Sequence, residues 1–570
     1  GILPFPKYEE SQKAYHTFSR STHAVIGMPV TCPDYDRAGA VLEAIACVNH
    51  ETVVPVYFET ALKVKYSRDD DSAEMYDLIL AGSTLNFGYL NKNCMYGTVT
   101  PPVELFIDGA INPGSYLQRS RRPRCRPEAA GRIHHRRSGI CKINPRSIPM
   151  QNNYSPEWKK RGDRTGLIRN ALLKSMGYTD RDIEKPIIGI INTWAETNPG
   201  HYHFRQLSEA VKRGVWAAGG FPLEVNTMSI CEVFFDLSSL IYRNLLSETT
   251  EELIARHPFD GVVLIGGCDK NVPAQLMAAV SANKPTIFLP GGAMLPGYYK
   301  GQMLVCGTAS FHIYNRYTSG EITLDEMTKY EGCLYGSAGA CPIMGTANTC
   351  QTVAEALGIA LPNSASSLGL SAEKARTAED TGRAIVELVE KDIKCCDIIT
   401  EKSIENAITV LMACGGSTNL IIHLIAIARR AGIHLTLEDF ARISDKTPVV
   451  VNVKPHGTEA VGSGFHNAGG VFSLMKELEG RLHLDCLTVS GKTVGENLAD
   501  ADMPYDTSVI RPLDDPIETK GGIAVLYGNL APGGAVIKRS AASPELMRHR
   551  GPAKVFEDLD ACKAWLLDDA

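Results

Sequence analysis

The sequence has 570 residues, a length that exceeds one ordinary hydrophobic core and predicts about two to four domains. Hydrophobic residues make up 44% and charged residues 21%, as in soluble globular proteins, and the formal net charge is -6. This balance gives no reason to expect nucleic-acid binding, and no apolar run approaches the ~20 residues of a membrane span. Sixteen irregularly spaced cysteines indicate reduced thiols, some of which could ligate metal, rather than a disulfide framework.

The first part of the chain, residues 1–118, has the pattern of short helices and strands rich in Tyr and Asp. Its segments "LPFPKYEESQKAYHTF", "CPDYDRAGAVLEAI" and "ALKVKYSRDDDSAEMYDLI" resemble the C-terminal portion of bacterial extracellular sugar-binding proteins of ABC transporters. The similarity covers only part of that family's fold and lacks the first lobe that would close around a ligand. We therefore expect a separate α/β fragment here, without assigned binding residues.

An arginine-rich segment follows this fragment. Residues 119–139 contain eight arginines and a single acid. One interpretation is a basic patch that binds nucleic acid. We favour two others for residues 119–149: an unstructured linker, because the segment lacks the apolar content to fold, or an artefactual join of unrelated reading frames.

Residues 150–510 have a different pattern. "KPIIGIINTW", "FDGVVLIGGC" and "KPTIFLPGGAM" are short apolar runs that end in polar or glycine residues, as buried parallel strands do. Between the first two, "HFRQLSEAVKRGVWAAGG" has apolar residues at helical spacing and ends in two glycines. The alternation predicts an α/β domain with a parallel sheet flanked by helices. In residues 511–570, "GGIAVLYGNLAPGGAVIK" predicts the start of a β-rich domain.

One of these strands ends in Cys268-Asp269-Lys270, followed by a proline and a helical pattern. Strand ends in open α/β sheets are where ligands bind. A thiolate suits iron–sulfur groups or zinc, a carboxylate suits Mg²⁺, and a carbamylated lysine would add an anionic oxygen ligand. The alternative is a strand end with a capping Asp269 and a surface lysine.

A second segment places Cys341 in a glycine- and alanine-rich turn before a helix. Small residues let the backbone approach a cofactor closely, although they equally permit a tight helix–helix contact. Together the segments resemble the dihydroxy-acid dehydratase/6-phosphogluconate dehydratase family over about residues 150–570. The resemblance rests on "INTWAETNPGHYHF", "GGCDKNVPAQLMAA", "LPGGAML", "SAGACPIMGTANTCQTVAEALGIALP" and "ACGGSTNLIIHLIAIA". The motifs "INTW", "YRNLL" and "LPGGAML" are most similar to those of the sugar-acid branch, the aldonate dehydratases.

The resemblance implies a hydro-lyase that removes water from a 2,3-dihydroxy acid, closest to a sugar acid (aldonate), and gives a 2-keto-3-deoxy acid. It implies an iron–sulfur cluster, 2Fe-2S in preference to 4Fe-4S, with Cys268 and Cys341 as ligands. Glu232, Asp269 and a carbamylated Lys270 correspond to Mg²⁺ ligands, and Lys270 belongs to the catalytic centre. Metal polarisation is needed because hydroxide is a poor leaving group.

The sequence departs from the family pattern in two places. Where the family has a third cluster cysteine in "NP-Cys-H", this chain has Gly200, which has no side chain to bind iron. Cys231 adjoins Glu232 and could substitute, but we favour the interpretation that no third thiolate exists. Neither "G-x-P-G-M-P-E" nor "G-R-x-S-G", the segment that carries the serine base, occurs in the chain. We expect residues 511–570 to begin a truncated swivelling barrel and the chain as given to be inactive.

Three alternatives remain open. The enzyme could be the dihydroxy-acid dehydratase of branched-chain amino-acid biosynthesis instead of a sugar-acid enzyme of carbohydrate metabolism. The chain could be a sugar-binding protein with an enzyme appended, or a non-catalytic chimera with a sugar-binding-protein fragment. For the dehydratase we expect a small-molecule substrate, no nucleic-acid or membrane partner, a cytoplasmic location, and a homodimer or homotetramer if the chain is complete.

Overall fold

The computed structural model describes residues 17–18, 83–84, 154–235, 238–305, 307–457 and 461–568. The chain forms two compact units, Gly1–Cys141 and Lys142–Ala570. In the first unit only the two-residue parallel strands β1 (Thr17–Phe18) and β2 (Ser83–Thr84) are described. Most of the expected sugar-binding-protein fragment and all of the arginine-rich segment lie outside the described residues, so both expectations stay predictions.

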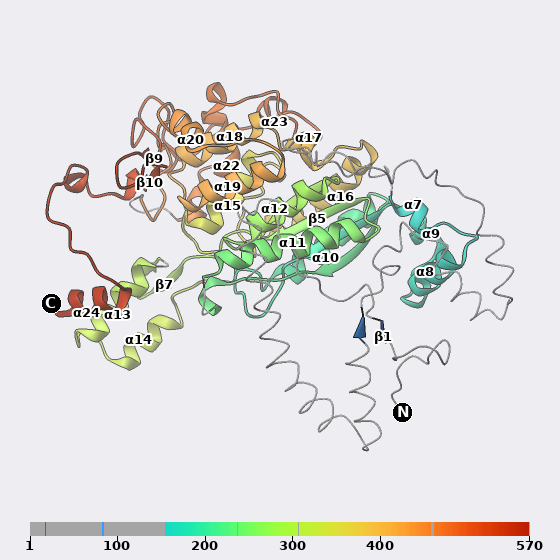
Figure 1. Ribbon diagram of the computed structural model, residues 1–570, viewed down its shortest axis with the longest axis horizontal. Coiled ribbons are helices and arrows are strands. Elements are labelled where there is room, and N and C mark those ends of the chain that lie inside the picture. The colour runs from blue at the N-terminus through green and yellow to red at the C-terminus, as the bar shows by residue number, and fades with distance from the viewer. Residues whose placement is uncertain are drawn as a thin grey trace, which may run out of the picture. The chain divides into compact units, whose positions relative to one another are not determined.

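A four-stranded parallel sheet forms the centre of the second unit (Figure 1). The strand order is β4-β3-β5-β6, and the two central strands are buried along their whole length. Their β-branched residues explain this, because parallel strands covered on both faces are continuous apolar runs. The strands are β3 (Ile187–Asn192), β4 (Phe221–Asn226), β5 (Gly261–Gly266) and β6 (Thr286–Pro290).

Helices cover both faces of this sheet. Gly261 and Gly266 lie on opposite faces of β5, because successive residues of a strand alternate between faces. A Cβ added at Gly261 would meet Val389 of one helix, whereas a Cβ at Gly266 would meet Gln275 of another. These helices are α16 (Ala372–Glu390) and α12 (Asn271–Ala282), which pack against α10 (Phe204–Ala217) and α11 (Leu240–Arg256), respectively. The prediction of a parallel sheet flanked by helices is confirmed.

Two glycines allow α10 and α16 to approach closely. A Cβ at Gly214 of α10 would overlap the carbonyl oxygen of Glu379 in α16. Likewise, a Cβ at Gly382 of α16 would overlap the carbonyl oxygen of Val211 in α10. Each helix therefore packs its backbone against the other, and neither glycine can be replaced without moving a helix axis.

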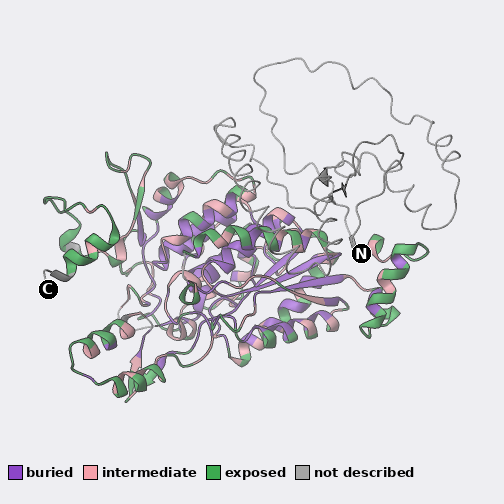
Figure 2. Ribbon diagram, turned by 60° about the horizontal axis from the view of Figure 1, so that its bottom comes forward, coloured by how far each residue is buried: buried purple, intermediate pink, exposed green. Residues whose placement is uncertain are grey.

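Further helices pack around α12 and share one continuous apolar core with the sheet, and many of the helices in Figure 2 are drawn as buried on one side. In this layer α19 packs on α12, and α18 packs on α15. The helices of the layer are α15 (Thr346–Ala356), α17 (Cys395–Ile398), α18 (Glu401–Ala413), α19 (Asn419–Arg430), α20 (Leu437–Ser444), α21 (Gly462–Asn467), α22 (Gly470–Glu477), η6 (Glu479–Arg481) and α23 (Val494–Leu498).

Shorter elements lie at the periphery. They are α7 (Tyr154–Trp158), α8 (Arg164–Ser175), α9 (Asp180–Ile183), η5 (Glu232–Phe234), β7 (Gly297–Tyr299), β8 (Gln302–Leu304), α13 (Thr308–Thr318) and α14 (Leu324–Glu331). Among the described residues, no helix combines the length and apolar character needed to cross a membrane.

The C-terminal part contains one antiparallel hairpin, of strands β9 (Ile523–Leu526) and β10 (Ala535–Lys538). The first strand packs on α20 and starts with the buried Ile523, while Leu530 in the connecting loop is almost fully exposed. The hairpin agrees with the β-rich pattern read from the sequence, and the swivelling barrel stays a prediction. It is followed by η7 (Arg539–Ala541), η8 (Pro544–Leu546) and α24 (Leu559–Asp568).

Candidate functional site

The carboxyl ends of β3 and β5 lie side by side at the centre of the sheet. From β3 the chain crosses to β4 on one side, whereas β5 and β6 lie on the other side of β3, so the strand order reverses between β3 and β5. Open α/β sheets bind ligands outside the carboxyl ends of their strands at such a point. Residues 193–203 and 267–270, which follow these strands, therefore lie where a ligand site is expected.

The structure brings together the three residues expected to bind Mg²⁺. The ammonium group of Lys270 donates hydrogen bonds to Oε1 of Glu232 (3.0 Å) and Oδ2 of Asp269 (2.6 Å). Only 6% of the Lys270 side chain is exposed, although its carboxylate partner Glu232 is half exposed. Ser239 donates a further hydrogen bond to Oε1 of Glu232 (2.6 Å). The alternative of a surface lysine is therefore wrong.

The charges of this group are strongly coupled. Burial and the nearby Glu232 raise the pKa of Asp269, although Lys270 opposes them. Burial also disfavours ionised Glu232, but hydrogen bonds from Ser239 and Lys270 keep its pKa below the usual value. Burial lowers the pKa of Lys270, and the two carboxylates outweigh it, so the pKa is raised overall. The lysine is thus a protonated cation between two acids.

This donor set fits Mg²⁺ in kind. Mg²⁺ prefers carboxylate oxygens, and here an ammonium group neutralises two of them as a bound cation would. A carbamate forms only from a neutral amine, and the raised pKa of Lys270 opposes loss of its proton. We therefore expect carbamylation of Lys270 to require a metal ion that replaces the charge of the ammonium group.

The thiol of Cys268 faces the place of the missing third cysteine. Its Sγ donates a hydrogen bond to Oδ1 of Asn198 (3.1 Å), which also accepts one from the amide of Gly200 (3.1 Å). A Cβ added at Gly200 would stand 2.8 Å from Sγ of Cys268. A side chain at position 200 would therefore lie directly beside the Cys268 thiol, close enough for both to reach one metal group.

Cys341 is exposed, on a loop that packs against the same region. The amide of Gly339 donates to the carbonyl of Pro199 (3.1 Å), and Ala340 forms a parallel bridge with Ala293. The loop of Cys341 therefore borders the loop of Gly200. Within the residues that the structure describes, no three His, Cys, Asp or Glu side chains form a ready metal site. The assigned thiols fit an iron–sulfur group in kind, but Cys268 and Cys341 alone fall short in number.

Comparison with known proteins identifies the family. The N-terminal domain of dihydroxy-acid/6-phosphogluconate dehydratases matches residues 185–497, and the C-terminal domain matches residues 508–570. The chain belongs to the dihydroxy-acid/6-phosphogluconate dehydratase family. The family prediction is confirmed, and with it the enzyme class, a dehydratase.

Similar proteins within this dehydratase family carry different names. A dihydroxy-acid dehydratase of Caldicellulosiruptor saccharolyticus is 46% identical over 397 residues, covering 68% of this chain and 71% of that protein. An L-arabinonate dehydratase of Rhizobium leguminosarum bv. trifolii is 44% identical over 418 residues, covering 73% of this chain and 72% of that protein. A 6-deoxy-6-sulfo-D-gluconate dehydratase of Pseudomonas putida is also 44% identical, over 389 residues that cover 68% of this chain and 67% of that protein. Identity alone does not separate the substrate classes.

His201, which the sequence pattern did not single out, holds the Cys268 loop of this dehydratase in place. Its Nδ1 lies 2.8 Å from the carbonyl of Thr193, and its Nε2 accepts the amides of Gly267 (3.1 Å) and Cys268 (2.9 Å). Because Nε2 accepts, the ring is neutral and carries its proton on Nδ1. Burial lowers the pKa of His201 to about 3, which favours the same state. The "NPGH" motif, which places it next to Gly200, was the available signal.

A second buried imidazole, His423 of α19, lies close to Lys270. Arg243 of α11 donates to its Nδ1 (3.1 Å), so its proton is on Nε2, which has no hydrogen-bond partner. Burial and then the charges of Arg243 and Lys270 lower the pKa of His423 to about 3. Polar groups of α11 and α19 therefore border the Lys270 end of the site.

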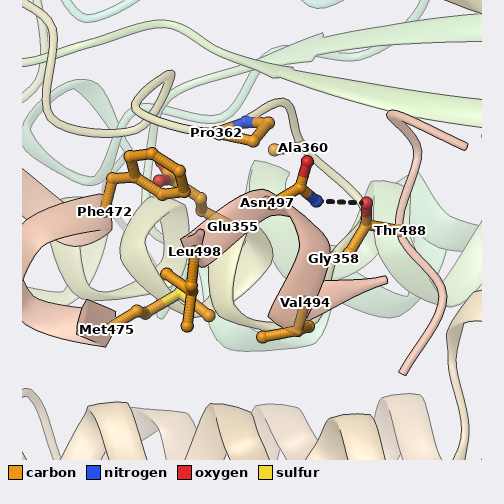
Figure 3. A pocket seen from close by; sticks show the side chains of 10 residues that line it. All are labelled: Glu355, Gly358, Ala360, Pro362, Phe472, Met475, Thr488, Val494, Asn497 and Leu498. Carbon is orange, nitrogen blue, oxygen red and sulfur yellow. Dashed lines mark hydrogen bonds between the residues drawn. The ribbon is translucent and has the colours of Figure 1, made fainter. Parts of the chain in front are cut away.

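The cavity drawn in Figure 3 is a separate, structural feature. It is lined mainly by apolar side chains, and Asn497 donates a hydrogen bond to Thr488 (2.9 Å) at its edge. Its volume of about 20 Å³ holds one water molecule. A sugar acid is far larger than this cavity, which therefore cannot hold one.

Proposed function

We propose that the protein is a hydro-lyase that removes water from a sugar acid (an aldonate) and gives a 2-keto-3-deoxy acid. In this proposal Glu232, Asp269 and a carbamylated Lys270 bind Mg²⁺. Cys268 and Cys341 bind an iron–sulfur cluster, 2Fe-2S rather than 4Fe-4S. The convergence of two carboxylates and a buried lysine at the carboxyl end of β5 is the observation that carries the proposal.

In this proposal the residues of the chain position the substrate, and their carboxylates offset the charge of the bound cation. Mg²⁺ and an iron centre, when bound, supply Lewis acidity toward the carboxylate and the departing hydroxyl group. Asp269 and Glu232 provide the negative charge that retains the cation next to the strand end. His201 fixes the amides of the Cys268 loop, so the thiol and Asp269 keep one relative position. This rigidity lowers the reorganisation needed during the reaction.

The polar surroundings of Lys270 support a sugar acid over a branched-chain acid. The guanidinium of Arg243 and the Nε2 proton of His423 are donors that a polyhydroxylated chain can use. A branched-chain dihydroxy acid presents only alkyl groups beyond its second hydroxyl, and these would leave buried donors unpaired, which costs about 1–3 kcal/mol each. Dihydroxy-acid dehydratase activity is the second candidate, because a relative with that name is 46% identical.

Calorimetric titration of the full chain tests the proposal, with binding as the readout. The chain is incubated with Mg²⁺ and bicarbonate and titrated with L-arabinonate, D-gluconate or 2,3-dihydroxy-3-methylbutanoate. We expect Mg²⁺-dependent binding of an aldonate that Asp269→Asn abolishes and the exposed control Glu390→Gln preserves. Binding of the branched-chain acid alone would establish the second candidate, and binding of neither would overturn the proposal.

Carbamylation of Lys270 has its own test. With ¹³C-labelled bicarbonate and Mg²⁺, the proposal expects a carbamate carbon resonance that is absent from Lys270→Arg. Omission of Mg²⁺ should remove the resonance as well, because the ammonium form is then favoured. A resonance that persists in Lys270→Arg would show that another lysine is modified.

A further inference from the structure

The segment that carries Glu232 has little regular structure to fix it. Among the described residues between β4 and α11, the only regular element is the single turn η5, which begins at Glu232. Its N-cap residue, Cys231, makes no capping hydrogen bond, and Val233 is 90% exposed. The local backbone therefore does little to direct the Glu232 carboxylate, which depends on contacts with other elements.

The side chain of Asn271 holds this segment from the start of α12. It accepts a hydrogen bond from the amide of Ile230 (3.1 Å) and donates one to the carbonyl of the same residue (2.6 Å). Both residues are fully buried, and buried backbone groups need hydrogen-bond partners. Asn198 donates a second hydrogen bond to that carbonyl (3.2 Å). One side-chain amide thus pairs both backbone groups of Ile230, as a neighbouring strand would.

The side chain of Ile230 is anchored at the same place. It forms a small apolar cluster with Leu246 of α11 and Ala274 of α12, both of which are fully buried. Ala274 lies three residues after Asn271, within the first turn of α12. Ile230 therefore docks onto this turn with its backbone and its side chain together.

The residue that holds Ile230 adjoins the partners of Glu232 in the chain. Asn271 directly follows Asp269 and Lys270, so one turn presents the acid and the lysine and also holds the segment two residues before Glu232. Consecutive Cα atoms are about 3.8 Å apart, so a fixed Ile230 leaves Glu232 little freedom. At the end of this short link, Oε1 of Glu232 lies 3.0 Å from Nζ of Lys270. Position 271 needs an amide, because an aspartate would set a carboxylate oxygen against the Ile230 carbonyl with no donor between them.

We propose that Asn271 is a positioning residue for Glu232. By holding the backbone of Ile230 against the start of α12, it brings the Glu232 carboxylate to Asp269 and Lys270. The inference rests on the proposed function, in which these three residues bind Mg²⁺. Replacing a residue that orients a metal ligand without touching the metal typically changes the affinity for the metal by about 10–100-fold. Asn271 acts in this way through two residues of backbone.

Binding of Mg²⁺ to the full chain tests this inference. Calorimetry in the presence of bicarbonate gives the Kd of Mg²⁺, which Asn271→Ala should raise by about tenfold or more. Asn406→Ala is the matched control. Asn406 of α18 is equally buried and makes the same pair of hydrogen bonds to the backbone of His483 (3.0 and 2.7 Å), which is not part of the site. The control should lose stability to a similar degree and keep the wild-type Kd.

Two further measurements separate positioning from a general loosening of the fold. In the Glu232→Ala chain, Asn271→Ala should not weaken binding further, because the carboxylate that it positions is absent. Mn²⁺ takes the same oxygen ligands as Mg²⁺, and the electron paramagnetic resonance spectrum of Mn²⁺ bound to Asn271→Ala should match that of Glu232→Ala. Asn271→Ser, whose hydroxyl is too short to bridge both backbone groups, is a milder variant and should raise the Kd likewise.

The outcomes separate this inference from the proposed function. A wild-type Kd in both Asn271 variants, or an equal rise of the Kd in Asn406→Ala, would overturn the positioning role and leave the proposed function standing. A further loss of affinity on adding Asn271→Ala to Glu232→Ala would overturn that role as well. If the wild-type chain binds neither Mg²⁺ nor Mn²⁺, the metal site is wrong, and the proposed function and this inference fail together.

Discussion

Replacement of His201 by alanine should loosen the Cys268 loop. The change leaves the buried amides of Gly267 and Cys268 and the carbonyl of Thr193 without their partner. Each orphaned group costs about 1 kcal/mol or more. The imidazole also stacks on Phe204 at 4.4 Å, and its removal leaves a cavity that costs about 1–2 kcal/mol. We expect the free energy of unfolding to fall by about 4 kcal/mol.

Two measurements check this expectation. Urea unfolding followed by circular dichroism gives the change in free energy, and hydrogen exchange of the peptide over residues 263–272 reports the loop directly. The exposed His434→Ala serves as the matched control and should change stability by no more than about 0.5 kcal/mol. A loss below about 1 kcal/mol, with the Gly267 and Cys268 amides still protected, would refute the role given to His201.

The titration of His201 should also make the free energy of unfolding depend on pH. Burial lowers the pKa of folded His201 to about 3, while the unfolded chain titrates near about 6.5. The unfolded state therefore binds the proton first, and stability falls as the pH drops through this window, by up to about 1.4 kcal/mol per unit. In His201→Gln this contribution is gone, so its stability deficit relative to wild type should shrink between about pH 7 and about pH 4. A constant deficit would contradict the assignment.

Two further substitutions test the packing around the sheet. Gly382→Ala should lower the free energy of unfolding by about 3 kcal/mol, because its Cβ would overlap the carbonyl of Val211. Gly480→Ala is the control and should change stability little, since open space surrounds that position. Equal urea midpoints for the two variants would be inconsistent with the close helix contact. Lys374→Met should cost about 3 kcal/mol, because it removes the donor to the buried carbonyls of Pro290 and Ser364; an unchanged thermal midpoint would count against these hydrogen bonds.

Most of the sheet could be predicted from the sequence because its central strands are locally distinctive. β3, β5 and β6 are continuous apolar runs, and the residues of α10 and α12 have a helical pattern. Strand β4 escaped prediction because its sequence, "FPLEVN", combines Pro222 with the charged Glu224. The structure explains the acid, since Glu224 accepts a hydrogen bond from Asn192 and pairs with Lys212 at the sheet edge.

The candidate site was predictable only as far as its residues are recognisable in short motifs. The run Cys268-Asp269-Lys270 marks a strand end by itself, and the structure shows Lys270 bonded to both expected carboxylates. The roles of Asn198 and His201 depend on hydrogen bonds to residues more than sixty positions away, such as those to Cys268. Such pairings have no local sequence signature, because they are created when two βα loops meet at the centre of the sheet.

The close approach of position 200 to Cys268 also constrains how the site can evolve. The backbone of Gly200 is not in the left-handed region, so a larger residue meets no conformational penalty there. Its Cβ would meet only the flexible thiol and Oδ1 of Asn198 at short range. Glycine and cysteine codons can differ by a single base, so one nucleotide change suffices to exchange the two residues. A cysteine at position 200 is therefore one mutational step away, and its side chain would lie directly against the Cys268 thiol.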